Sequence, residues 1–203
     1  FEEKNILLIN GDVNEKNTKN EIIKNGKFDI ILDDGSHNSN DIVKSFCNYF
    51  DHLNDNGLFI VEDLHCSYQQ QHGGGLFYPI SSINFFKKLV DIINYEHWGI
   101  EKNKSWLLRG FSENYNINLA NLQLDMIHSI EFVNSLCFIK KNSSEKNKIG
   151  KRVVTGNNAM VVGDRKKLNN TKITVLDQSN NPWSNNNLLP EEELVLLKKK
   201  KQV

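Results

Sequence analysis

Two pairs of adjacent acidic residues each follow a run of apolar residues. Asp33 and Asp34 close one run, and Glu62 and Asp63 close the next one along the chain. If both runs are parallel β-strands, their carboxyl ends meet at one edge of a sheet and gather the four carboxylates there. Carboxylate oxygens are the ligands that hard divalent cations such as Mg²⁺ prefer. The pattern predicts a metal site with Asp34, Glu62 and Asp63 as ligands. The alternative is that these acids only cap helices or lie in loops.

Three further side chains near these acids are candidates for chemistry. His37 lies three residues after Asp34, on the predicted turn into a helix. A histidine in this position can act as a general base because imidazole titrates near neutral pH. The alternative is an exposed histidine at a helix N-terminus. His65 and Tyr68 follow the second acidic pair, where we expect them to contact a substrate.

An acid and a glycine run suggest how a ligand is enclosed. Asp12 follows the apolar run at 5–10. In a nucleotide-binding α/β fold, an acid in this place can accept a hydrogen bond from an adenine amino group, whereas the alternative is a loop acid in a Gly-Asp turn. The glycines at 73–75 follow no strand and precede no Lys-Ser or Lys-Thr, so they are not a phosphate-binding loop. They are interpreted as a lid hinge or a linker.

These residues must be positioned by elements whose order the apolar pattern indicates. We expect strands at 5–10, 28–32 and 58–61, helices at 21–24, 42–53 and 82–93, and a hairpin formed by 127–133 and 136–140. A further strand at 173–176 and a helix at 190–203 are also suggested. The alternation of strands and helices predicts half of a doubly wound α/β sheet finished by an antiparallel pair. Ligands of such sheets bind outside the carboxyl ends of the strands, where the acids lie.

Composition limits the classes of partner. The formal net charge is zero and the pI is about 7.2, which favours neither nucleic acid nor a membrane surface as a partner. No apolar run approaches the roughly 20 residues that a membrane-spanning helix needs. The three cysteines are widely spaced and odd in number, so they predict neither a zinc site nor a disulfide framework. This cysteine usage favours a reducing compartment, and we expect a cytoplasmic protein.

The chain divides into two parts by composition. Residues 1–141 hold the predicted sheet, and residues 142–203 are rich in Asn and Lys and are expected to be peripheral or partly disordered. The first residue is Phe rather than Met, and a predicted strand follows almost at once. This indicates a fragment of a longer chain.

The motifs resemble those of a known family. The Asp-Asp-Gly-Ser-His motif at 33–37, the Val-Glu-Asp motif at 61–63, the Ser-Tyr pair at 67–68 and the glycine run resemble the metal-dependent sugar O-methyltransferases of antibiotic biosynthesis. That family includes macrolide-sugar and rhamnosyl O-methyltransferases and is related to the cephalosporin-methoxylating proteins. The resemblance covers about residues 5–140. It implies the class I fold of methyltransferases that depend on S-adenosylmethionine (SAM), which is Rossmann-like.

The resemblance also implies roles for single residues. Asp34, Glu62 and Asp63 would hold Mg²⁺, and His37 would be the general base. The acceptor would be the sugar of a small molecule or glycan, methylated on a hydroxyl such as a deoxysugar 2-OH. Family members tend to form oligomers, which suggests a homo-oligomer.

For the cofactor, the resemblance places Asp12 near the adenine of SAM and Asp33 at the boundary between cofactor and substrate. Class I methyltransferases begin with a strand, a glycine-rich loop and a second strand whose acid binds the ribose, and none of these precedes Asn5. The N-terminal strands are therefore expected to be missing. Two alternatives follow: a truncated, inactive module for interaction or scaffolding, and a methyltransferase for a non-sugar hydroxyl such as that of a catechol.

Overall fold

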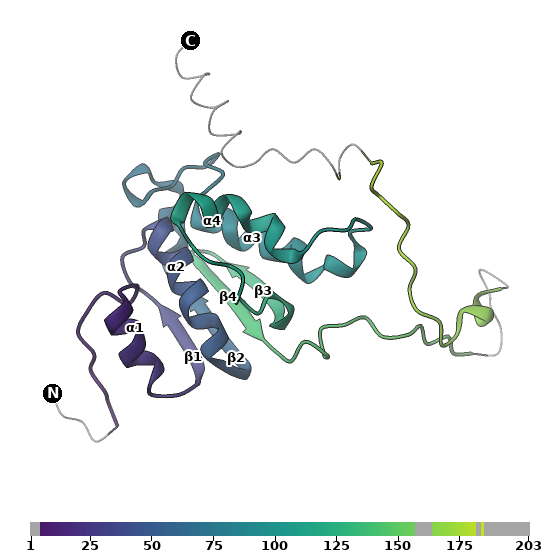
Figure 1. Cartoon of the computed structure of the whole chain (residues 1–203), viewed down its shortest axis with the longest axis horizontal. Helices are drawn as coiled ribbons and strands as arrows, with labels where there is room; N and C mark the ends of the chain where they lie inside the picture. The colour runs from purple at the N-terminus through teal and green to yellow at the C-terminus, as the bar shows by residue number, and fades with distance from the viewer. Residues whose placement is uncertain (1–4, 157–163, 182–183, 185–203) are drawn as a thin grey trace, which may run out of the picture.

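The computed structural model describes residues 5–156, 164–181 and 184. Its regular elements are α1 (Lys16–Ile23), β1 (Phe28–Asp33), α2 (Ser39–Tyr49), β2 (Leu53–Val61), α3 (Ser82–Ile93), α4 (Arg109–Tyr115), β3 (Ile127–Val133) and β4 (Leu136–Lys141). Six short 3₁₀ helices lie between them: η1 (Phe50–His52), η2 (Leu64–Tyr68), η3 (Gln70–His72), η4 (Tyr95–His97), η5 (Lys104–Leu108) and η6 (Leu124–Met126). A further one, η7 (Arg165–Leu168), follows β4. Figure 1 shows their arrangement.

The sheet has four strands in the order β1-β2-β4-β3. β1 and β2 are parallel, and β4 runs antiparallel to both β2 and β3. The predicted hairpin is confirmed, with Ser135 in the turn at a φ of 68°. The predicted fold class, a Rossmann-like α/β sheet ending in an antiparallel hairpin, is likewise confirmed.

The hydrophobic core lies between the sheet and the helices α2 and α3, which pack against each other and against the strands. Phe46 of α2 is fully buried at its centre. Its ring centroid lies 4.9 to 5.6 Å from those of four other phenylalanines: Phe50, Phe59, Phe85 and Phe86. Such tilted and edge-on pairs bury large apolar areas and add aromatic attraction.

Replacing Phe46 by alanine is expected to lower the free energy of unfolding by about 3–5 kcal/mol, because the cavity removes contacts to four rings. Urea unfolding followed by circular dichroism measures this. The matched control is Phe77→Ala, since Phe77 is 81% exposed. Its effect should stay within about 0.5 kcal/mol. Equal effects of the two variants would contradict this account of the core.

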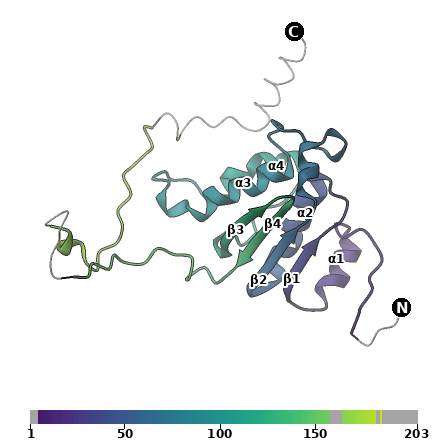
Figure 2. The same cartoon turned by 180° about the vertical axis from the view of Figure 1, so that it is seen from behind.

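The opposite face of the sheet is partly open in the region that the structure describes. Ile30 and Leu32 of β1 are 62% and 52% exposed. In Figure 2 the sheet lies in front of α2, with α3 above the strands. Parallel strands are usually buried on both faces. Among the described residues, β1 therefore leaves part of its apolar surface exposed on this face.

The predicted strand at 5–10 was wrong. Ile6, Leu7 and Leu8 are all more than half exposed, at 58%, 65% and 79%. A β-strand is stabilised by hydrogen bonds to a neighbouring strand and by burial of alternate side chains. Among the described residues this segment pairs with no strand, so its apolar sequence has nothing to form a ladder with.

The helix predicted to end near Asn54 ends earlier. α2 stops at Tyr49, and Leu53 already belongs to β2, where it pairs with Phe28. The register shifts between Phe28 and Ile30, and Asn56 has a φ of 66°, so the polar residues at 54–57 form an irregular part of the strand. A turn-like composition inside a strand is typical of a bulge.

The segment beyond Lys141 has little regular structure where it is described. Residues 173–176, predicted as a strand, form none, and Gln178 N–H donates to the Gly99 carbonyl at 2.7 Å. The helix suggested at 190–203 lies outside the described residues. No helix within the described ranges combines the length and the apolar character that crossing a membrane requires.

Candidate metal and catalytic site

The parallel pairing of β1 and β2 places the two acidic pairs next to each other at the carboxyl edge of the sheet. Asp33 pairs with Val61, and the Glu62 N–H donates to the Asp33 carbonyl at 2.9 Å. The residues after these positions, Asp34 and Asp63, therefore leave the sheet side by side. The sequence predicted this meeting of strand ends from the parallel arrangement alone.

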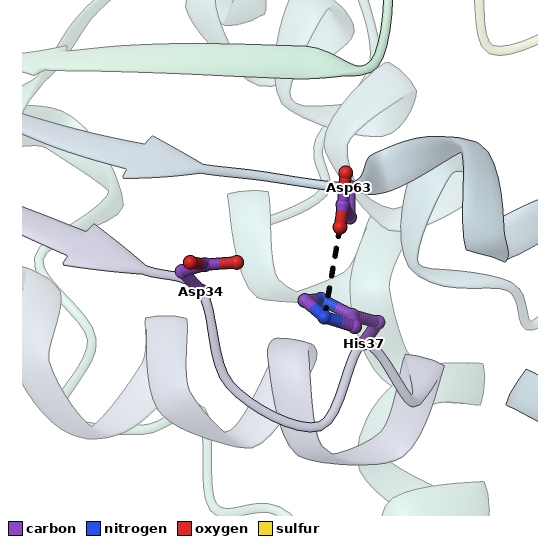
Figure 3. Close-up of side chains that lie close together, drawn as sticks. All are labelled: Asp34, His37 and Asp63. Atoms are coloured by element: carbon purple, nitrogen blue, oxygen red, sulfur yellow. Dashed lines mark ion pairs between the residues drawn. The ribbon is translucent and has the colours of Figure 1, made fainter.

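Three side chains converge just beyond these strand ends. One ligand atom from each of Asp34, His37 and Asp63 lies within 4.8 Å of the other two. Figure 3 shows the Asp63 carboxylate above the His37 ring and the Asp34 carboxylate to its left, and His37 Nε2 lies 3.6 Å from Asp63 Oδ2. Glu62 is not part of this cluster. The structure thus joins two of the three predicted ligands and the predicted base.

Two members of the cluster have a backbone conformation that is unfavourable for residues other than glycine. His37 has a φ of 56° and Asp63 a φ of 50°, both in the left-handed region. Such positions cost of order 1–3 kcal/mol each and collect at functional sites, where the surrounding structure holds them in place. The left-handed turn after each strand redirects the chain, so that Asp34, His37 and Asp63 face one another.

Local hydrogen bonds hold the loop that carries His37. The Ser36 hydroxyl donates to Asp41 Oδ2 at 2.7 Å. The Asn38 side chain caps α2 by accepting from the Asn40 N–H at 3.1 Å, which satisfies a free donor at the helix start. The loop is therefore tied to the first turn of α2 on both sides of His37.

The hairpin turn supports the loop that carries Asp63. The Leu64 N–H donates to the Ser135 carbonyl at 2.9 Å, and the Ser135 hydroxyl lies 2.7 Å from His65 Nδ1. The same His65 atom lies 3.7 Å from Asp63 Oδ1. His65 thus stands beside the cluster in contact with protein groups, and Tyr68, at the end of η2, is 42% exposed outside it. Sequence reasoning missed Ser135, because a serine in a turn carries no signal of a partner 70 residues away.

The two residues predicted to bind the cofactor line one cavity. Asp12 and Asp33 both border a cavity of about 280 Å³ next to the start of α2. Asp33 Oδ1 accepts from the Gly35 N–H at 3.3 Å, whereas its buried Oδ2 has no hydrogen-bond partner among the described residues. Burial raises the pKa of Asp33 and outweighs the opposing influence of the nearby Ser45 hydroxyl and Gly35 N–H, which lower it. A buried acceptor without a partner suits a ligand that brings amino or hydroxyl donors.

The glycine run at 73–75, interpreted from the sequence as a hinge or a linker, also packs closely against the backbone of η2. The Gly75 N–H donates to the Ser67 carbonyl at 2.9 Å. A Cβ atom at Gly74 would lie 2.0 Å from that same oxygen, so no other residue fits there without displacing the backbone. This contact holds the glycine run against η2, close to Asp63.

The fold and site together define an α/β protein with a carboxylate–histidine cluster at the carboxyl edge of its sheet. It is similar to the solved structure of the MycE methyltransferase from the mycinamycin biosynthetic pathway in complex with Mg, SAH and mycinamycin VI. The TM-score is 0.54 at 23% sequence identity, over 73% of this chain and 35% of that chain. This likeness shows the fold.

Sequence comparison finds relatives of the same kind. The chain is 28% identical over 136 residues to demethylmacrocin O-methyltransferase of Streptomyces fradiae, covering 65% of this chain and 32% of that protein. It is 39% identical over 74 residues to 8-demethyl-8-alpha-L-rhamnosyl tetracenomycin-C 2'-O-methyltransferase of Streptomyces olivaceus, covering 36% and 20%. No protein-family model matches. The resemblance to sugar O-methyltransferases is confirmed, and the chain spans a third or less of these relatives' length.

Proposed function

We propose that the chain is the metal- and acceptor-binding part of a SAM- and Mg²⁺-dependent O-methyltransferase that acts on a sugar hydroxyl. The observation that carries this proposal is the cluster of Asp34, His37 and Asp63 at the carboxyl edge of a methyltransferase-like sheet. The names of the relatives support a sugar-bearing small molecule as acceptor.

The donor set fits a hard cation. Asp34 is exposed and Asp63 half-exposed, so two carboxylates are available to an ion that keeps several waters for a substrate to displace. His37 supplies a nitrogen, which Mg²⁺ does not prefer, and this leaves its imidazole free to accept a proton. Glu62 remains a predicted third ligand.

In the proposed reaction a methyl group passes from the SAM sulfonium to the acceptor oxygen: the sulfur–carbon bond breaks, the carbon–oxygen bond forms and S-adenosylhomocysteine leaves. Bound Mg²⁺ would lower the pKa of a coordinated hydroxyl. His37 takes the hydroxyl proton, and the Asp63 carboxylate 3.6 Å away stabilises the resulting imidazolium. Asp12 would lie near the adenine of SAM, and Asp33 would line the boundary between cofactor and substrate; both residues border one cavity.

Removing the metal tests this proposal. Transfer of labelled methyl groups from SAM to a rhamnosyl acceptor by the complete gene product should cease in EDTA and return with excess MgCl₂. Calcium chloride in place of MgCl₂ controls for a general effect of divalent salt. Activity that EDTA leaves unchanged would show that the metal role is wrong.

Two other functions are outcomes of the same experiments. The chain spans a third or less of the length of its curated relatives. An inactive module for interaction or scaffolding is therefore the first alternative. Absence of both SAM binding and metal binding would favour that module. Methylation of a catechol but not of a sugar would favour an enzyme for non-sugar hydroxyls. A cytoplasmic location and a homo-oligomeric state also remain predictions.

A further inference from the structure

Three buried serine hydroxyls form a network among α2, η2 and α3. Ser39, Ser67 and Ser82 are each fully buried. The Ser82 hydroxyl lies 2.6 Å from that of Ser67 and 3.3 Å from that of Ser39, and the Ser82 N–H donates to Ser39 Oγ at 3.1 Å. Ser82 is therefore the central member of the network.

The network joins the two loops that carry the cluster. Ser39 is the first residue of α2 and lies two residues after His37. Ser67 belongs to η2 and lies four residues after Asp63. Ser82 is the first residue of α3 and bonds to both. The hydroxyl of a third element thus connects the start of α2 to η2.

Because the three hydroxyls are buried, their hydrogen bonds restrict how α2, η2 and α3 can move relative to one another. A buried hydroxyl that loses its partner costs the free energy of its desolvation, so the three side chains favour one mutual arrangement. α3 supplies a fixed support, because Phe85, Phe86 and Leu89 on the same helix are fully buried in the core. A shift of η2 relative to α2 would break a bond in the network and would also change the separation of Asp63 and His37.

We propose that Ser82 is a positioning residue for the metal site. Through Ser39 and Ser67 it sets the spacing between the loop of Asp34 and His37 and the loop of Asp63. This inference depends on the proposed function, since it concerns the same metal site. Groups that hydrogen-bond directly to metal ligands contribute about 10–100-fold to metal affinity, and Ser82, which acts one step further out through Ser39 and Ser67, is expected to lie at the lower end of that range.

The test is Mn²⁺ binding by the full chain, with free Mn²⁺ measured by electron paramagnetic resonance. Ser82→Ala should weaken binding about 10-fold. Ser82→Thr, which keeps the hydroxyl, should bind more tightly than Ser82→Ala. Ser81→Ala is the matched control, because the neighbouring Ser81 is equally buried and its hydroxyl has no hydrogen-bond partner among the described residues. It should keep the wild-type affinity.

Urea unfolding of each variant separates positioning from stability, because a purely structural role would lower the unfolding midpoint without changing Mn²⁺ affinity. If the wild-type chain binds Mn²⁺ and Ser82→Ala binds it equally well, this inference is overturned while the metal site stands. If the wild-type chain binds no Mn²⁺, both the metal site and this inference are wrong. If Ser82→Ala does not fold, Ser67→Ala removes the shorter bond and is held to the same criterion.

Discussion

Asp63→Asn is expected to remove divalent-metal binding and to leave the fold intact. Asp63 is one of two carboxylates in the cluster, and its φ is 50°. Asparagine has nearly the same shape and tolerates the left-handed conformation, so the loop keeps its course. The amide carries no charge, and a hard cation depends on ligand charge. Since partners outside the coordination sphere already contribute 10–100-fold, loss of a direct ligand should weaken Mn²⁺ binding by more than about 100-fold.

Two comparisons sharpen this experiment. Asp55→Asn makes the same chemical change at an exposed position of β2 outside the cluster and should bind Mn²⁺ as the wild type does. Glu62→Gln tests the predicted third ligand. This variant should lose less Mn²⁺ affinity than Asp63→Asn, because Glu62 lies outside the cluster. Wild-type affinity in Asp63→Asn, with an unchanged unfolding midpoint, would remove Asp63 from the metal site.

The sequence could predict that the two acidic pairs meet at one edge of the sheet. It could not predict which acid of each pair points into the metal cluster and which points elsewhere. Parallel strands place their carboxyl ends at one edge, so the approach of Asp34 and Asp63 follows from the element order. Adjacent residues of an extended chain point to opposite sides, and a left-handed turn at Asp63 changes direction again. Asp33 therefore lines the cavity it shares with Asp12, while Asp34 joins the cluster.

Where prediction failed, the missing information was non-local. The segment at 5–10 has the composition of a strand, yet a strand needs a neighbour, and composition does not report one. The bond between Ser39 and Ser82 spans 43 residues, and no spacing rule connects the two positions. The glycine run suggested mobility, whereas the close approach of Gly74 to the Ser67 carbonyl depends on tertiary packing.

His37→Asn is expected to lower kcat by about 10²–10⁴ in the complete gene product while metal binding persists. The imidazole is the cluster member able to take a proton from an acceptor hydroxyl, and the Asp63 carboxylate at 3.6 Å stabilises the charge that forms. Asparagine accepts the φ of 56° and can still donate a hydrogen bond to Asp63, but it cannot act as a base. Steady-state methyl transfer measures kcat, and Mn²⁺ titration shows whether the metal site survives.

The control distinguishes proton transfer from the loss of any nearby ring. The His72 ring lies edge-on to that of His37, with centroids 6.5 Å apart, and is not a member of the cluster. His72→Asn should therefore keep kcat near the wild-type value. If the variants at 37 and 72 lose kcat equally, the effect is one of loop packing. If His37→Asn turns over as fast as the wild type, the base lies elsewhere and Asp63 serves the metal alone.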